Sequence, residues 1–243
     1  MRIALLQMTS GIDPARNEAT LCTAVKDAAE GGAAMLFTPE MSGLIDSNRE
    51  RARPHILPVK GHPVLEAVCE AARAAAVWVH LGSLAIDAGD RWANRAFLID
   101  ASGQIRARYD KLHLFDVDLP TGESWRESAS YVPGQGTVVA DTPVGPLGLS
   151  ICYDIWFPET TRTVTAMGAE VILHPVMTHT IDRDVDLNIA KASAAMFQAY
   201  VFDINGLDKG FKVLPIADWA ALPARPISPP PKPMPPEPGT PWA

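Results

Sequence analysis

The segment Gly-Leu-Ser-Ile-Cys-Tyr-Asp-Ile-Trp-Phe-Pro, residues 148–158, is the most informative about the fold, because the chain passes there from a strand to a helix around one cysteine. The segment before Cys152 is strand-like, and a strand is expected over residues 146–151. Pro158 suits the first position of a helix, and Gly168 ends it. Cys152 therefore lies where a strand ends.

Outward from Cys152, strands and helices alternate in both directions. Asp13-Pro14 predicts the start of a helix between strands 2–7 and 34–37, and a helix from about Pro63 precedes strand 77–81. Hairpins are interposed, one of them turning at residues 100–103. On the other side, strands are expected at 171–174 and 200–204, with a helix near 184–198 between them. This order predicts an α/β fold, a four-layer α-β-β-α sandwich of two mixed sheets with helices outside.

Two further residues with catalytic side chains follow predicted strands: Glu40 closes the run 35–37, and Lys111 follows Tyr109-Asp110. A thiol nucleophile, a carboxylate that takes its proton and an ammonium that stabilises an oxyanion make an acyl-transfer site. A nearby lysine would also lower the pKa of the thiol. Each residue also has a purely structural interpretation. Glu40 would be a solvated loop acid, Lys111 a surface lysine paired with Asp110, and Cys152 a cysteine that fills the core.

These segments resemble the nitrilase superfamily of carbon–nitrogen hydrolases, whose Glu–Lys–Cys triad has the same chain order. The resemblance covers residues 1–206, and in detail the segments are most similar to the Nit-like amidase branch. It rests on the triad segments and on further short matches: Gln7-Met8, Leu81-Gly82-Ser83, Asn94-Arg95-Ala96, Glu127-Ser128 and residues 201–205. It implies the same sandwich fold.

The resemblance also implies roles for individual residues. Glu127 would orient Lys111, although a surface pair with Arg126 is the simpler alternative. Lys111 and the backbone N–H of Tyr153 would bind the oxyanion. Many Nit-like amidases carry Arg at the position of Trp156. The tryptophan would make the pocket more apolar and favour a neutral amide as substrate. His113 is expected to pack structurally, since the family uses no histidine base.

The expected function is hydrolysis of a small linear amide through a Cys152 thioester, releasing ammonia and a carboxylate. No metal or organic cofactor is needed. The alternatives are an N-carbamoyl-amide or nitrile hydrolase, and an inactive fragment or interaction module that keeps the triad.

The amino-acid composition argues against nucleic acids and membranes as binding partners. Hydrophobic residues make up 47% of the 243, and the net charge of −7 argues against nucleic acid. No apolar stretch is long enough to span a bilayer, and no signal peptide is recognisable. Cys22 and Cys69 lie on apolar helix faces and indicate packing in a reducing cytoplasm. The resemblance adds a homo-oligomer, provided that the fold is complete.

The predicted hydrolase domain ends at about residue 206. Residues 215–243 contain 11 of the 22 prolines, so residues 207–243 are expected to form a disordered tail. The family normally continues with further strands here, and their absence suggests a frameshift or truncation.

Overall fold

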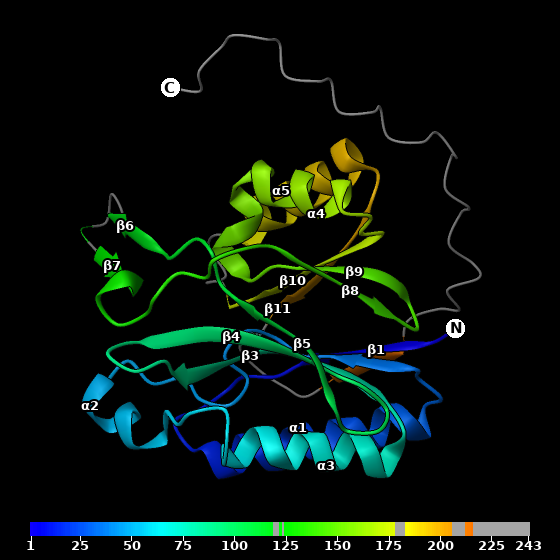
Figure 1. Cartoon of the computed structure of the whole chain (residues 1–243), viewed down its shortest axis with the longest axis horizontal. Coiled ribbons are helices and arrows are strands. Elements are labelled where there is room, and N and C mark those ends of the chain that lie inside the picture. Colours follow the sequence, from blue (N-terminus) through cyan, green and yellow to red (C-terminus); the bar gives the residue numbers. More distant parts are fainter. Residues whose placement is uncertain (119–121, 123, 178–182, 206–211, 216–243) are drawn as a thin grey trace, which may run out of the picture.

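The computed structural model describes residues 1–118, 122, 124–177, 183–205 and 212–215, and these form four stacked layers (Figure 1). Helices α1 (Pro14–Glu30) and α3 (Pro63–Ala75) cover one sheet, and α4 (Pro158–Ala166) and α5 (Arg183–Phe197) cover the other. The predicted α-β-β-α architecture is confirmed.

The first sheet has the strand order β12-β1-β2-β3-β4-β5. Its strands are β12 (Lys212–Pro215), β1 (Ile3–Gln7), β2 (Met35–Phe37), β3 (Trp78–Asp87), β4 (Trp92–Ile99) and β5 (Ile105–Asp110). Strands β1 to β3 are parallel, whereas β3 to β5 are antiparallel. The sheet is therefore mixed, as predicted.

The second sheet, in the order β11-β10-β9-β8, is also mixed. Its strands are β11 (Tyr200–Asn205), β10 (Val171–Val176), β9 (Gly145–Leu149) and β8 (Val138–Thr142). Only the β8–β9 pair is antiparallel. A separate two-stranded ribbon, β6 (Asp116–Asp118) and β7 (Ser124–Arg126), follows β5.

The core consists of apolar layers on both faces of the sheets. Phe37, Leu149 and Leu173 meet between the two sheets, and all three are fully buried. Leu36 and Val79, next to inward-facing positions, point to the opposite face and pack with α1 and α3. This alternation is the period-2 geometry of strands, and it joins the two sheets through one shared layer.

Local sequence signals set the helix boundaries. Asp13 caps α1, because its Oδ1 accepts from Ala15 N at 3.0 Å and Pro14 follows at the first helical position. Pro63 and Pro158 begin α3 and α4 in the same position. These starts agree with the sequence prediction.

Strand β12 lies beyond residue 206, where the hydrolase domain was expected to end, so the sheet extends further along the chain than predicted. Lys212–Pro215 pair antiparallel with β1, with Lys212 opposite Gln7 and Pro215 opposite Ala4. The segment precedes the prolines of the tail except for its last residue, so it keeps the backbone donors that a ladder requires. Of the predicted tail, residues 207–211 and 216–243 lie outside the described residues.

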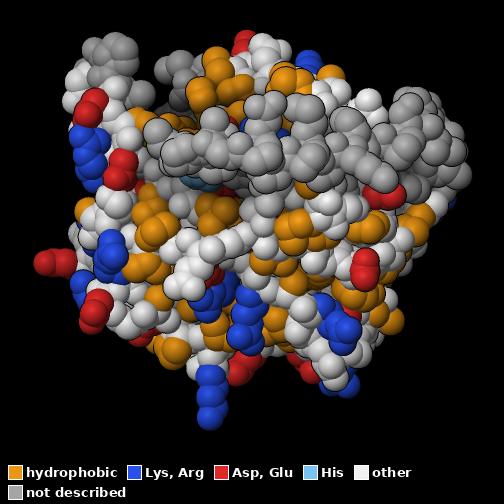
Figure 2. Space-filling view, turned by 45° about the horizontal axis from the view of Figure 1, so that its top comes forward, with side chains coloured by type: hydrophobic (Ala, Val, Ile, Leu, Met, Phe, Trp, Pro, Cys, Tyr) orange, Lys and Arg blue, Asp and Glu red, His pale blue; other side chains and the backbone are white. Residues whose placement is uncertain are grey.

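The visible surface mixes charges of both signs with apolar side chains (Figure 2). Several large apolar side chains on or beside α4 and α5 are exposed: Met167, Val185, Leu187 and Met196. Among the described residues, no helix is both long enough and apolar enough to cross a membrane.

Candidate active site

Glu40 stands in a turn directly after β2, and β3 holds this turn in place. Gly82 N donates to Thr38 Oγ1 at 2.9 Å, and Met41 N donates to Ser83 Oγ at 3.0 Å. A Cβ on Gly82 would lie 1.9 Å from Thr38 O, so a glycine is required for this close approach. The β3–β4 register shifts between Leu81 and Leu84 at the same place. The Leu-Gly-Ser segment therefore positions Glu40.

Cys152 begins the short helix η3 (Cys152–Trp156) just after β9. Its φ is +50°, a left-handed conformation that a residue with a Cβ adopts only under constraint. Such backbone strain, of about 1–3 kcal/mol, persists where the surroundings over-determine the conformation and is frequent at active sites. The turn presents the Cys152 thiol to the two carboxylates described next.

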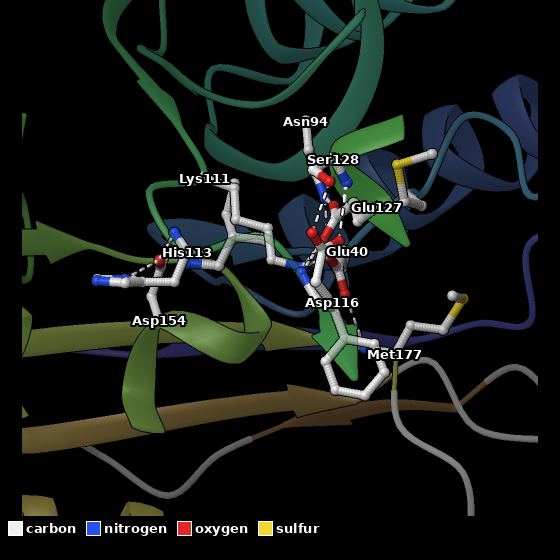
Figure 3. A network of polar contacts seen from close by, with 12 residues as sticks. Glu40, Asn94, Lys111, His113, Asp116, Glu127, Ser128, Asp154 and Met177 are labelled. Carbon is white, nitrogen blue, oxygen red and sulfur yellow. Dashed lines mark hydrogen bonds and ion pairs between the residues drawn. The ribbon is translucent and has the colours of Figure 1, made fainter. Parts of the chain in front are cut away.

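Lys111, directly after β5, connects two acidic side chains. Its Nζ lies 3.2 Å from Glu40 Oε1 and 2.9 Å from Glu127 Oε2, and the lysine side chain is 3% exposed. Glu127 begins the short helix η2 (Glu127–Ala129) after β7. Figure 3 shows Glu40, Lys111 and Glu127 converging from three separate segments of the chain. The structure thus brings these predicted residues together.

Three residues from other segments donate further hydrogen bonds to the same two carboxylates. Asn94 Nδ2 donates to Glu40 Oε1 at 2.8 Å and to Glu127 Oε1 at 3.3 Å. Phe115 N donates to Glu127 Oε2 at 2.7 Å, and Met177 N donates to Glu40 Oε2 at 3.2 Å. Sequence reasoning assigned no role to Asn94. The only signal was its place in the Asn-Arg-Ala segment on a strand.

The electrostatics of this cluster differ in one respect from the sequence-based expectation. Burial, the charge of Glu40 and, less strongly, that of Glu127 raise the pKa of Cys152 well above its ordinary value, although Lys111 acts to lower it. One ammonium facing two carboxylates leaves an excess of negative charge, which disfavours a thiolate. The expected lowering by Lys111 is therefore outweighed.

Lys111 itself stays protonated. Burial alone would lower the pKa of Lys111, but the charges of Glu40 and Glu127, and that of Cys152 when it is ionised, outweigh burial and hold this pKa well above its ordinary value. The resting site consequently combines an ammonium with a neutral thiol that hydrogen-bonds to Glu40. Removing the thiol proton requires an acceptor at the moment of attack, and Glu40 occupies that place.

The other two predicted site residues lie within η3. Tyr153 follows Cys152 in the first turn, where a backbone N–H has no acceptor inside its helix. Trp156, at the far end of η3, is 44% exposed, and its Nε1 donates to Asp186 Oδ1 of α5 at 3.1 Å. Their roles toward an oxyanion and a substrate remain predictions.

No cluster of three or more metal-ligating side chains occurs in the part of the chain that the structure describes.

An α-β-β-α sandwich with Glu, Lys and Cys at its strand ends is the arrangement typical of the nitrilase superfamily. The chain belongs to the carbon-nitrogen hydrolase family, whose family model matches residues 2–210. The resemblance recognised from the sequence is thereby confirmed.

Among similar proteins, a deaminated glutathione amidase from Yersinia enterocolitica is 37% identical over 177 residues, covering 71% of this chain and 61% of that protein. A chloroplastic omega-amidase from Arabidopsis thaliana is 30% identical, covering 71% of this chain and 48% of its own length. The chain thus spans about half to three fifths of the length of these curated relatives.

Solved structures agree with the fold. The NitFhit protein of C. elegans superposes with a TM-score of 0.76 at 32% identity, covering 84% of this chain and 50% of that one. A double mutant of the amidase from Nesterenkonia sp. AN1, in complex with acrylamide, gives a TM-score of 0.74 at 27% identity, covering 84% and 76%.

Proposed function

We propose that this protein is an amidase that hydrolyses a small linear amide through a thioester on Cys152. The observation that carries the proposal is the buried ion pair of Lys111 with Glu40 beside a cysteine held in a strained turn. A nucleophile, a proton acceptor and a fixed cation within one cluster supply the functions that acyl transfer needs.

In the first half-reaction, the Cys152 sulfur attacks the amide carbonyl while its proton moves to Glu40. Proton transfer accompanies attack, because the raised pKa keeps the resting thiol neutral. The oxyanion is stabilised by the Lys111 ammonium and the N–H of Tyr153. Glu40 then returns the proton to the departing nitrogen, the C–N bond breaks, and ammonia leaves a thioester.

In the second half-reaction, Glu40 takes a proton from water, which attacks the thioester carbonyl. The C–S bond breaks, Glu40 returns the proton to the sulfur, and the carboxylic product leaves. Glu127 holds Lys111 throughout, through its 2.9 Å ion pair. The sequence of steps needs no metal or organic cofactor.

The relatives support both the nucleophile and the substrate class. The Nesterenkonia amidase has been solved with acrylamide added to its active-site cysteine and in complex with butyramide. Two curated relatives are named deaminated glutathione amidase and omega-amidase. We therefore expect amides as the first substrates to test, with N-carbamoyl compounds and nitriles in the same panel.

The test measures ammonia release by three variants, Cys152→Ala, Glu40→Gln and Lys111→Met, against the wild type. We expect Cys152→Ala to abolish turnover and each of the others to lower kcat by about 10²–10⁴-fold or more. Cys69→Ala, on α3, is the matched control and should remain active. Mass spectrometry should locate the acyl adduct on Cys152, and an adduct on Cys22 or Cys69 would refute the assignment.

Arg49, in helix α2 (Arg49–Ala52), gives a specific reason to include anionic amides. Its Nη2 donates to the carbonyl of Arg126, next to Glu127, at 3.2 Å. No carboxylate among the described residues pairs with it. Burial and the charges of Glu127 and Glu40 raise the pKa of Tyr131, whereas the charges of Lys111 and Arg49 act to lower it. Arg49 thus lies within electrostatic reach of a side chain that borders the site.

Arginine suits a carboxylate because its planar guanidinium presents paired donors. If the substrate carries a carboxylate, Arg49→Gln should raise KM for anionic amides and leave KM for butyramide unchanged. Arg162→Gln, on α4 and exposed, is the control. Equal effects of Arg49→Gln on both kinds of amide would restrict the proposal to neutral amides, and Trp156→Arg would then test the apolar side of the pocket.

We also propose a cytoplasmic location. Cys22, Cys69 and Cys152 are all free thiols in the structure, which fits a reducing compartment. Fractionation of cells that express a tagged chain tests this, and recovery from an extracytoplasmic fraction would contradict it.

A further inference from the structure

Asp154, two residues after Cys152, is a fully buried carboxylate with four hydrogen-bond donors around it. Its Oδ2 accepts from Ile151 N at 2.9 Å and from Tyr109 Oη at 2.7 Å. Its Oδ1 accepts from His113 N at 2.8 Å and faces His113 Nδ1 at 2.9 Å. Since a carboxylate only accepts, the histidine carries its proton on Nδ1. Both oxygens are thus used twice.

These donors come from the two segments that carry the catalytic side chains. Ile151 immediately precedes Cys152, whereas Tyr109 and His113 stand two residues before and two residues after Lys111. Asp154 therefore joins the nucleophile turn of one sheet to the lysine segment of the other. Figure 3 shows the His113–Asp154 pair on the side of Lys111 opposite Glu40.

No direct hydrogen bond found among the described residues connects Lys111 itself to the Cys152 turn. The ammonium of Lys111 is bound by Glu40 and Glu127, which come from the first sheet and from η2. Besides Glu40, which contacts both side chains, the residues that flank Lys111 and Cys152 fix the relative placement of the two segments, and Asp154 contacts both flanks.

The same carboxylate constrains the strained turn. Cys152 has φ +50°, and Asp154 closes the turn around it in both directions: Asp154 N donates to Ile151 O at 3.1 Å, and Asp154 Oδ2 accepts from Ile151 N. The His113 ring, held by Asp154, stacks on Phe157 at the end of η3 with a centroid distance of 3.7 Å. The turn is thus fixed at both ends.

We propose that Asp154 is the positioning residue of this site, holding the Cys152 turn in its left-handed conformation and in register with Lys111 through Tyr109 and His113. The proposal rests on the proposed amidase function. Asp154 touches neither substrate nor reacting atoms in this scheme and acts only through its two neighbouring segments. Burial and the Asp154 charge raise the pKa of Tyr109 well above its ordinary value, so the hydroxyl remains a donor.

The central variant is Asp154→Asn, which keeps the shape but replaces one acceptor oxygen with an NH₂ group that faces existing donors. A misplacement of reacting groups by about 1 Å can cost about a hundredfold in rate. We therefore expect kcat to fall by about a hundredfold and KM to stay within about threefold. Asp141→Asn, an exposed carboxylate of β8, is the matched control and should match the wild type.

A pair of milder variants keeps the test decisive if Asp154→Asn does not fold. His113→Asn retains an N–H donor near the position of Nδ1 without the ring, whereas His113→Phe retains the stacked ring without the donor. Loss of one hydrogen bond to a charged group is worth about a tenfold change or more. We expect His113→Phe to lose about tenfold in kcat at unchanged KM, and His113→Asn to recover most of it.

A crystal structure of one impaired variant supplies a readout that does not depend on turnover. We expect Cys152 to leave the left-handed region or Lys111 Nζ to move relative to the Cys152 sulfur. A folded Asp154→Asn or His113→Phe enzyme with wild-type kcat and an unchanged Cys152 turn would overturn the proposal. If the wild type hydrolyses no amide, the proposed function fails, and the structural comparison alone decides the role of Asp154.

Discussion

Lowering the pH from 8 to 5 should destabilise this fold through two fully buried histidines, His80 on β3 and His174 on β10. Neither ring nitrogen of either side chain has a hydrogen-bond partner among the described residues. Burial lowers the pKa of His80 from 6.5 to about 3 and that of His174 from 6.5 to about 4. Both rings are therefore neutral in the folded protein at pH 5.

The sign follows from proton uptake. Between the folded and the unfolded pKa the unfolded chain binds more protons, so the free energy of unfolding rises with pH in that window. The contribution is complete above the unfolded pKa and is lost as the pH falls below it. At pH 5 each histidine removes about 2 kcal/mol from the free energy of unfolding, or about 4 kcal/mol together.

The assay is urea unfolding, followed by circular dichroism at several pH values from 8 to 5. Carboxylates also contribute to the wild-type slope, so the informative quantity is the difference between variants. His80→Leu should lose about 2 kcal/mol less than the wild type over this range. His55→Asn, which alters an exposed side chain in helix η1 (Arg53–His55), should follow the wild type. Parallel curves for wild type and His80→Leu would refute the reasoning.

Three further outcomes are expected. Gly82→Ala should destabilise the fold by about 1–3 kcal/mol and reduce turnover, because its Cβ would collide with Thr38 O. Gly136→Ala, at an open position, is the control and should do neither. Equal urea midpoints for the two variants would contradict this. Asn94→Ala should lower kcat/KM by about tenfold or more, because hydrogen bonds to two carboxylates are lost, and exposed Asn188→Ala should not; unchanged kinetics would show that Asn94 is dispensable. Glu40→Gln should shift the pH profile of iodoacetamide alkylation at Cys152 to lower pH, because Glu40 raises the pKa of this thiol. Glu50→Gln is the control and should leave the profile unchanged. An unchanged profile for Glu40→Gln would show that Glu40 does not lie near the Cys152 sulfur.

Much of the fold could be predicted from the sequence, because its main elements carry local signals. Proline at the first helical position marked α1, α3 and α4, and apolar runs marked the central strands. The β6–β7 ribbon was missed because Asp116–Asp118 and Ser124–Arg126 are only three residues long and have no buried face to produce an alternating pattern. Strand β12 was missed because it lies beside a proline-rich segment.

The convergence of the candidate residues was predictable from the sequence, whereas their electrostatics were not. Glu40, Lys111 and Cys152 were recognisable from their strand-end contexts and from family resemblance. The direction of the Cys152 pKa shift was not, since it depends first on the burial of the thiol and then on how many carboxylates surround one ammonium at close range. The part played by Asn94 likewise appears only when β4 brings its amide between two acids that are far apart in sequence.

The pairing of β1 with β12 joins segments that are more than 200 residues apart in the chain. During synthesis at about 5–20 residues per second, β1 waits about 10–40 seconds for its antiparallel neighbour. For that time its outer edge carries unpaired backbone groups that another nascent chain could extend. Folding yield should accordingly depend on holding this edge apart from other chains, and pulse-labelled ribosome-bound chains stopped before β12 should co-sediment with one another more than chains stopped after it.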